Sequence, residues 1–574
     1  MAQQSIVNYQ VSFPDSKAHY VNVEMNIDAG KAENINLKMP VWTPGSYLVR
    51  EFARHVEGFE ASQNGKNLSW KKTDKNTWSV KNSSSGKITI NYQVYAFELT
   101  VRTSFVDDEH AYLNGASVFM FAEEMDNNPI EISVLPKDNW KKISTGLPSV
   151  SQNRFSAKNY DELADSPFEI GNQEIINFSA AGIPHEIAMF GSGKYNKEKI
   201  VADMTKIINE EAAIFGKHPC EKYVFIIHNL STGGGGLEHL NSTTLQVSRD
   251  AYSNESSYLS FLSLVAHEYF HLWNVKRLRP EALGPFNYSV ENYTQMLWVS
   301  EGFTAYYDDL ITRRTGFYSP GKYLDLVSST INTIENAAGN KVQSASESSF
   351  DAWIKYYKRN ENSTNSTISY YDKGALIALV IDMEIMNQSK GSKNLDDLMK
   401  YMYDEYYTKL NRGFTDEEFQ KGVEKLTGKS MDLFFRNQIY GTQAFDYNTI
   451  FTSAGLKLVN TNANKNEPFL GILNTQVGGK IMITSVFRNG SAQLAGISPN
   501  DEIIASDNYR VDDIAKIVVG KKVGDVCKLI INRDGKILTI DVPLLKSTIV
   551  KYTLEQMDKP TELQTKVYKK WLKI

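Results

Sequence analysis

Residues 263–275 read SLVAHEYFHLWNV and contain the pattern H-E-x-x-H at His267, Glu268 and His271. Because residues four apart lie on one face of a helix, the two imidazoles can reach the same metal ion. Glu268 lies beside the first of them and can accept a proton from a water on that metal. Two histidines and a glutamate inside a core are costly unless a metal satisfies them. The flanking residues predict such a core, and they are Leu262, Leu264, Val265, Ala266, Phe270 and Leu272.

A catalytic zinc site needs a third protein ligand, and glutamates downstream of this segment can supply it. Glu301 lies in MLWVSEGFTAYYDDL, an apolar stretch that runs into an amphipathic helix pattern. Glu291 lies in NYSVENYTQ, a polar stretch typical of the surface. We therefore expect Glu301 to be the third ligand and Glu291 to be a solvated carboxylate.

A glycine-rich segment, STGGGGLEHLNSTT, precedes the histidine pattern at residues 231–244. Consecutive glycines such as Gly235 and Gly236 allow backbone to approach a ligand closely, although such a run is more often only a flexible turn. Glu238 and His239 follow at once, and a carboxylate there could hold the free amino group of a peptide.

A tyrosine pair opens the segment TISYYDKGALIALVIDMEI at residues 367–385. A phenol near the metal, such as that of Tyr371, could donate a hydrogen bond to the oxyanion of a tetrahedral intermediate. The alternative is that both tyrosines are ordinary core or surface aromatics, because the chain contains 31 tyrosines.

Composition excludes several other classes of protein. The 574 residues predict three or four domains, and 41% hydrophobic with 22% charged residues is ordinary for a globular protein. The net charge of −5 gives no support for a nucleic-acid surface or a polybasic membrane anchor. Two cysteines, Cys220 and Cys527, predict neither a disulfide framework nor a cysteine zinc site. The start of the chain has no signal-peptide pattern, and no apolar run is long enough to span a membrane.

Strand and helix patterns divide the chain into four parts. Residues 1–172 contain alternating segments such as HYVNVEMNI and predict a β-sandwich-like domain. Residues 173–450 start with a helical pattern and a buried strand, YVFIIHNL, and then become mostly helical. Strands return in a compact module at residues 456–548, and residues 549–574 form a polar, helix-compatible tail. The patch NENSTNST at 360–367 predicts a loop.

Taken in order, GGGGLEH, HEYFH, WVSEG and YYDKG resemble the motifs of the gluzincin aminopeptidases of clan MA. The resemblance implies that Glu238 binds the substrate's amino group beside Gly235 and Gly236. It also implies that Glu301 completes the zinc site and that Tyr371 is the oxyanion donor.

Two departures from the common motifs narrow this resemblance. Glu-His stands where Glu-Asn is usual, and the spacing from HEYFH to the ligand glutamate is longer than usual. Both are similar to the glycyl aminopeptidase family, metallopeptidase family sixty-one, as are PVWTPGSYLVREFARHV at 40–56 and HEYFHLWNVKRLRP at 267–280. The family implies a multidomain α+β fold with an N-terminal β-sandwich-like domain, a thermolysin-like catalytic domain with a helical second half, and a C-terminal PDZ domain. It also implies one zinc ion per chain and removal of N-terminal Gly or Ala.

The C-terminal module carries two segments of its own that resemble PDZ domains. PFLGI at 468–472 looks like the loop that binds a peptide carboxylate, and RNGSAQLAGISPNDEII at 488–504 looks like a segment of bacterial peptidase PDZ domains. Such domains add a peptide as an extra strand and hold its C-terminus with backbone amides. A purely structural module packed on the catalytic part is the alternative.

Two other functions remain open on the sequence alone. In a zinc endopeptidase, Glu238 would be structural and the cleft would be open at both ends. In a non-enzymatic peptide-binding protein, the zinc site would be vestigial. We expect peptides as substrates and no nucleic-acid partner. By analogy with the family we expect a periplasmic or secreted location in a bacterium, with a cytoplasmic one as the alternative.

Overall fold

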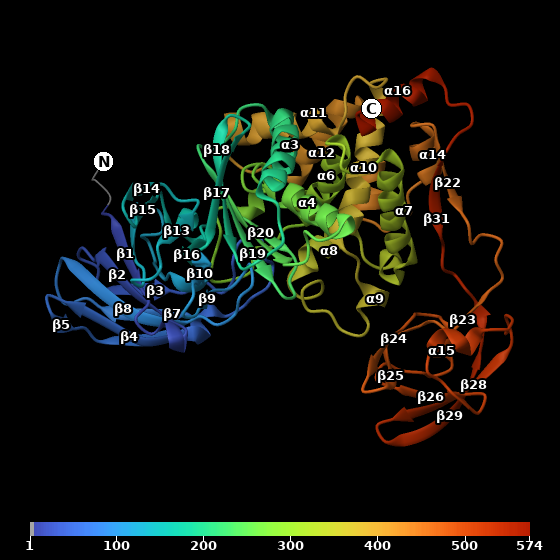
Figure 1. Cartoon of the computed structure of the whole chain (residues 1–574), viewed down its shortest axis with the longest axis horizontal. Coiled ribbons are helices and arrows are strands. Elements are labelled where there is room, and N and C mark those ends of the chain that lie inside the picture. The colour runs from blue at the N-terminus through green and yellow to red at the C-terminus, as the bar shows by residue number, and fades with distance from the viewer. Residues whose placement is uncertain (1–4) are drawn as a thin grey trace. The chain divides into compact units, whose positions relative to one another are not determined.

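The computed structural model describes residues 5–574, and Figure 1 labels its helices and strands along the chain. Residues 1–4, the start of the segment without a signal-peptide pattern, lie outside the described residues. The chain forms two compact units. The first comprises Met1–Thr294, Tyr307–Phe317 and Asp396–Phe419, and the second Gln295–Tyr306, Tyr318–Leu395 and Gln420–Ile574.

The first unit begins with an eight-stranded sheet whose strands alternate buried and less buried residues. A four-stranded sheet shares its hydrophobic core, so that Leu37 and Val80 pack in one cluster with Val23 and Ile90. Two sheets around one core form the sandwich that the period-two pattern predicts. The large sheet runs β14 (Ser149–Ser151), β15 (Arg154–Ala157), β12 (Ile130–Leu135), β1 (Val7–Ser12), β2 (Tyr20–Asp28), β8 (Lys87–Tyr95), β4 (Val56–Gln63), β5 (Lys66–Asn67), and the small one β11 (Phe121–Ala122), β3 (Asn34–Lys38), β7 (Thr77–Lys81), β6 (Trp70–Asp74).

A five-stranded sheet follows in the same unit and carries the glycine-rich segment at its edge. Its inner strands are parallel, and β19 is buried along nearly its whole length, as its mostly apolar sequence YVFIIHNL predicts. The edge strand β20 pairs antiparallel with β21. In sheet order the strands are β17 (Glu174–Ala180), β18 (Ile183–Phe190), β19 (Tyr223–Leu230), β21 (Ser242–Ser248) and β20 (Gly236–Glu238).

Two long helices accompany this sheet, and each begins at an asparagine cap. Asn196 caps α3 (Lys197–Phe215) and Asn254 caps α4 (Glu255–Phe270), in both cases by accepting a hydrogen bond from a backbone N–H of the first turn. The helix α4 packs against α3 and against the strands β20 and β21. The glycine-rich strand and the histidine-bearing helix are therefore neighbours.

The second unit is helical around α10 (Tyr370–Gln388), a helix buried along most of its length. It packs against α5 (Leu297–Ser300), α7 (Pro320–Asn336) and α8 (Ala345–Phe350). Residues 360–367 differ from the predicted loop, because Ser363–Ser366 form one helical turn, α9. The remaining helices that the unit contains wholly or in part include α6 (Gly302–Arg314), α12 (Asp416–Thr427), α14 (Tyr447–Thr452) and α16 (Glu562–Leu572).

The C-terminal β-rich module of this unit has a hydrophobic core of its own, which includes Leu470, Ile483 and Leu529. The strand β24 forms one edge of its sheet. The sheet contains β24 (Ile472–Val477), β25 (Lys480–Val486), β26 (Glu502–Ser506), β28 (Val526–Arg533) and β29 (Lys536–Pro543), with β27 (Tyr509–Arg510) beside β26. No helix within residues 5–574 is long and apolar enough to cross a membrane.

Candidate metal centre and active site

The helix α4 brings the three residues of the H-E-x-x-H pattern together at its C-terminal end. His271 is the residue at which the helix ends, and it is buried, as is Glu268. Val265 and Ala266 are fully buried, which confirms the prediction that this helix lies in a core. The pattern therefore places His271 and Glu268 away from bulk water, while the side chain of His267 is 15% exposed.

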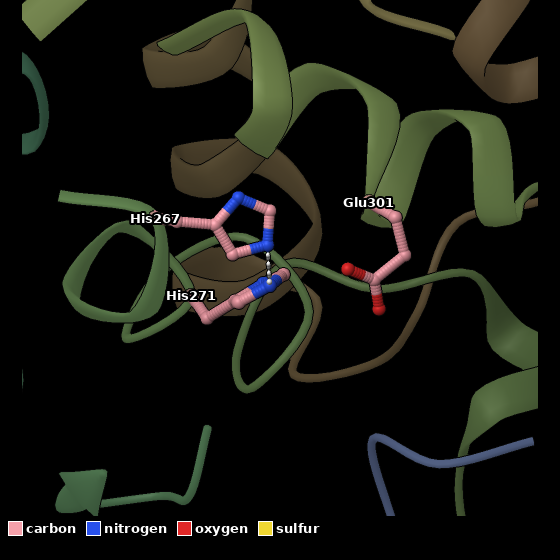
Figure 2. A group of neighbouring side chains, drawn as sticks. All are labelled: His267, His271 and Glu301. Carbon is pink, nitrogen blue, oxygen red and sulfur yellow. Dashed lines mark hydrogen bonds between the residues drawn. The ribbon is translucent and has the colours of Figure 1, made fainter. Parts of the chain in front are cut away.

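The ring nitrogens of the two histidines are oriented for a shared cation. Nδ1 of His267 lies 2.9 Å from Asp308 Oδ2, and Nδ1 of His271 lies 2.8 Å from the carbonyl oxygen of Asn274. A carbonyl and a carboxylate accept hydrogen bonds, so both Nδ1 atoms carry the proton and both Nε2 atoms present lone pairs. The Nε2 atoms face each other at 3.3 Å (Figure 2). A metal ion between them would satisfy both.

Glu301 supplies the third candidate ligand, as the sequence predicts. It is buried at the end of α5, and one atom from each of His267, His271 and Glu301 lies within 4.8 Å of the others (Figure 2). Ligand atoms about 2.1 Å from a tetrahedral zinc ion lie roughly 3.4 Å apart, and the two histidine Nε2 atoms lie 3.3 Å apart. Two histidines and a glutamate are also ligand types that catalytic zinc takes. Within residues 5–574, Glu291 belongs to no such group.

A second group of acidic and histidine side chains lies against the first. Glu238, Glu268 and His271 are all buried, and one atom from each lies within 4.8 Å of the others. Gly236 borders this group, since a Cβ there would lie 2.3 Å from Glu268 Oε1. Gly235 has a φ of +101° and open space around it. Glycine is therefore required at 236 for space and at 235 for backbone conformation.

The carboxylate of Glu238 is buried and incompletely satisfied. Its Oε1 has no hydrogen-bond partner among the described residues. Gly45, from the N-terminal sandwich, lies so close that a Cβ there would be 2.6 Å from this oxygen. A cavity of about 230 Å³ adjoins the carboxylate and is also lined by Tyr47, Arg279 and Phe286. The site therefore offers a buried carboxyl group with an unsatisfied oxygen at the wall of a cavity.

An ion-pair cluster holds the segment that follows Glu238. Asp165 Oδ1 lies 3.2 Å from His239 Nδ1 and 2.8 Å from Lys276 Nζ, while Oδ2 accepts a hydrogen bond from the N–H of Leu240. Although burial opposes it, the Lys276 ammonium and His239 hold the pKa of Asp165 below its usual value. A charged Asp165 thus holds the segment that directly follows Glu238, at residues 239 and 240.

Tyr371 lies in the first turn of α10, and its phenol is protonated at neutral pH. Burial, together with the Glu301 carboxylate, raises the pKa of Tyr371 well above its usual value. Backbone contact between two glycines brings these segments together, because a Cβ on Gly302 would lie 2.4 Å from the Cα of Gly374. The motifs WVSEG and YYDKG therefore meet through their glycines.

Several residues at the site carry no sequence signal that connects them with the histidines or with Glu238, although Gly45 lies in the family-like segment at 40–56. Gly45 and Asp165 are more than 70 residues away from Glu238 along the chain. Asp308 sits in the helical pattern that follows Glu301, where an acidic residue is ordinary. Only the folded chain brings these residues to the histidines and to Glu238.

Comparisons with known proteins indicate the family to which the chain belongs. Family models described as Peptidase M61 N-terminal domain, M61 glycyl aminopeptidase and PDZ domain match residues 8–172, 260–377 and 468–544. A solved structure of an aminopeptidase N family protein from Idiomarina loihiensis is 31% identical, with a TM-score of 0.92, over 99% of this chain and 100% of that one.

Two further matches are weaker or shorter. An M1 zinc metallopeptidase from Deinococcus radiodurans, bound to a Tyr-Ser-Ala substrate, has a TM-score of 0.50 at 10% identity over 77% of this chain and 95% of that one. The serine protease Do-like HtrA from Lactobacillus helveticus is 42% identical over 67 residues, which span 11% of this chain and only 16% of that relative.

Fold and site together define a metallopeptidase of the aminopeptidase class. Its sandwich, its helical middle and its C-terminal PDZ module confirm the predicted fold class. The chain belongs to the M61 family of peptidases, the glycyl aminopeptidase family that its motifs resemble.

Proposed function

We propose that the protein is a zinc aminopeptidase that removes the first residue of peptides, with Gly and Ala preferred. The observation that carries the proposal is the buried Glu238 carboxylate, whose Oε1 lacks a partner beside Glu268 and His271. A buried charge without a partner is costly, and a substrate's terminal ammonium would supply one through a charge-assisted hydrogen bond. Binding the ammonium there limits cleavage to the first peptide bond.

Each residue of the site has a role in this proposal. His267, His271 and Glu301 hold the metal, one ion per chain, and Asp308 orients the first imidazole. Zinc, when bound, supplies a Lewis acid that lowers the pKa of a water and polarises the scissile carbonyl.

The remaining steps belong to side chains of the chain itself. Glu268 takes a proton from the attacking water and returns it to the leaving amine. Tyr371, protonated at neutral pH, donates a hydrogen bond to the developing oxyanion. Gly235 and Gly236 leave room for the substrate's backbone beside Glu238.

The finer parts of the proposal rest on the family. The description glycyl aminopeptidase supports the preference for small first residues, and the PDZ match supports a peptide C-terminus as a ligand of the module. A periplasmic or secreted location in a bacterium, and the division at residues 172, 450 and 548, belong to the same proposal.

The test is hydrolysis of aminoacyl p-nitroanilides of Gly, Ala, Leu, Lys and Asp, with and without a zinc chelator, beside one N-acetylated peptide. Chelator-sensitive release from the Gly and Ala substrates, with no cleavage of the acetylated peptide, is the expected result. Cleavage of the acetylated peptide without action on the aminoacyl substrates would make the protein an endopeptidase and Glu238 a structural residue.

A further inference from the structure

A buried asparagine of the catalytic part, Asn365, is hydrogen-bonded to the PDZ module of the same unit. Asn365, in the helical turn α9, is 3% exposed. Its Nδ2 donates a hydrogen bond to the carbonyl oxygen of Val486 at 2.8 Å, and its Oδ1 accepts one from the N–H of Arg488 at 2.8 Å. A single side chain thus satisfies one donor and one acceptor of the module's backbone, as a paired strand would.

A second hydrogen bond supports the same contact. Ser485 Oγ donates to the carbonyl oxygen of Glu361 at 2.8 Å. Residues 485–488, at the end of β25, are therefore hydrogen-bonded to residues 361–365 through the side chains of Asn365 and Ser485. Buried hydrogen bonds of this kind specify one position of the backbone, because a shift would leave polar groups unsatisfied.

The same segment, residues 485–488, also contacts the PFLGI loop at residues 468–472. Ile472 pairs with Val486 in the sheet, and the N–H of Phe487 donates to the carbonyl oxygen of Gly471 at 2.9 Å. Ser491 Oγ donates to the carbonyl oxygen of Phe469 at 2.7 Å. Since β24 is an edge strand, a peptide added beside it would press on this loop.

Only a short and tightly held segment separates Asn365 from the first turn of α10. A Cβ on Gly339 would lie 2.3 Å from the carbonyl oxygen of Thr367. The N–H of Ile368 donates to Gln343 Oε1 at 3.0 Å, and Ser369 caps α10 by accepting from the N–H of Asp372. Because these contacts hold the segment between Asn365 and Tyr371 in place, a shift of Asn365 is expected to shift Tyr371 as well.

We infer that Asn365 is a positioning residue that couples the PFLGI loop of the PDZ module to Tyr371. A peptide carboxylate bound at residues 468–472 therefore changes the rate of hydrolysis at the zinc site. The inference rests on the proposed aminopeptidase function. It adds that a second peptide, bound at the PDZ module, regulates that activity.

A double-mutant cycle tests the coupling on the full-length zinc-loaded protein. Asn365→Ala is expected to lower kcat for the best aminoacyl p-nitroanilide by about tenfold with little change in KM. In the Tyr371→Phe background, the same change should have almost no further effect, because the residue it positions has lost its hydroxyl. Equal factors in both backgrounds would overturn the inference, since a merely structural role is additive.

Two further variants keep this test decisive. Asn448→Ala, at an exposed position on α14, is the matched control and should leave kcat unchanged. If Asn365→Ala fails to fold, Asn365→Asp replaces it. This change keeps an acceptor for the N–H of Arg488, and it replaces the amide donor to Val486 and Asn362 with a carboxylate oxygen. Wild-type kinetics in that variant would overturn the inference.

The predicted effect of a bound peptide on kcat is tested with a peptide that ends in an apolar residue and has a free C-terminal carboxylate. The same peptide with an amidated C-terminus is the control. The free acid should bind the wild type by fluorescence anisotropy and change kcat by about fivefold, while the amide does neither. Asn365→Ala should keep the binding and lose the change in kcat. Absence of binding, or binding without any change in kcat, would overturn the inference that a bound peptide changes the rate of hydrolysis. A wild type that hydrolyses no aminoacyl substrate would instead contradict the proposed function.

Discussion

Replacement of Gly236 by Ala tests whether the backbone of β20 sets the position of the Glu268 carboxylate. A Cβ at this position would lie 2.3 Å from Glu268 Oε1 and 2.4 Å from its Cδ. Non-bonded heavy atoms reach their optimum at roughly 3.5 Å, so the carboxylate must move by about 1 Å. A misplacement of about 1 Å costs on the order of 100-fold in rate. We expect kcat to fall by that factor.

The assay measures kcat and KM on Gly p-nitroanilide together with zinc content and Tm. Zinc should stay bound, because the three atoms nearest to a Cβ at residue 236 all belong to the proposed base, Glu268. Gly234→Ala is the matched control, since a Cβ there meets nothing within 4 Å, and it should change kcat by less than about twofold.

Two outcomes would refute this reasoning. In the first, Gly236→Ala keeps wild-type kcat, which would mean that Glu268 has room to act from another position or is not the base. In the second, Gly234→Ala loses as much activity as Gly236→Ala, which would assign the effect to the flexibility of the glycine run and not to the contact with Glu268.

The other predictions concern the proposed base, the amine site, the metal and the buried ion pair. Glu268→Gln should lower kcat by about 1,000-fold with zinc retained by atomic absorption, and loss of zinc would instead make Glu268 a ligand. Glu238→Gln keeps the shape but not the charge, so kcat/KM for Gly p-nitroanilide should fall by about 10- to 100-fold, and an unchanged value would contradict amine binding. Chelation should abolish hydrolysis and lower Tm, with both restored by Zn²⁺, and activity in metal-free protein would contradict the metal site. Lys276 and His239 hold the pKa of Asp165 below its usual value, so its contribution to stability is present above the unfolded-state pKa of about 4 and is lost as pH falls through the lower folded-state pKa. Asp165→Asn should therefore reduce the loss of Tm at acid pH, and an unchanged slope of Tm against pH would contradict a charged Asp165.

Much of the metal site could be predicted because its chemistry is local. The helical repeat places His267 and His271 on one face, and the structure has their Nε2 atoms 3.3 Å apart. Glu301 could be preferred to Glu291 because a buried ligand needs an apolar surrounding, and its flanking residues provide one. These inferences depend only on neighbours in sequence.

The turn at residues 363–366 shows where local patterns mislead. Asn, Ser and Thr predict a loop because their side chains compete for backbone hydrogen bonds. The structure forms a helical turn there and directs Asn365 to the backbone of a module about 120 residues later. A polar patch looks the same in sequence whether water or another segment satisfies it.

The sequence by itself determined the elements that depend on short periods and on neighbouring residues. These are the alternating strands of the sandwich, the buried strand β19 and the histidine-bearing helix. Residue type and spacing also limit which side chains can hold a metal, so the candidate ligand set His267, His271 and Glu301 is a prediction from the sequence.

Only the tertiary structure decided which distant groups complete the site. Gly45 faces Glu238, Asp165 joins His239 to Lys276, and Asp308 orients His267. Each pairing depends on how separately formed elements pack, and a buried polar group takes whichever partner the folded chain brings within hydrogen-bonding distance. Local sequence fixes the need for such a partner, while long-range packing selects it.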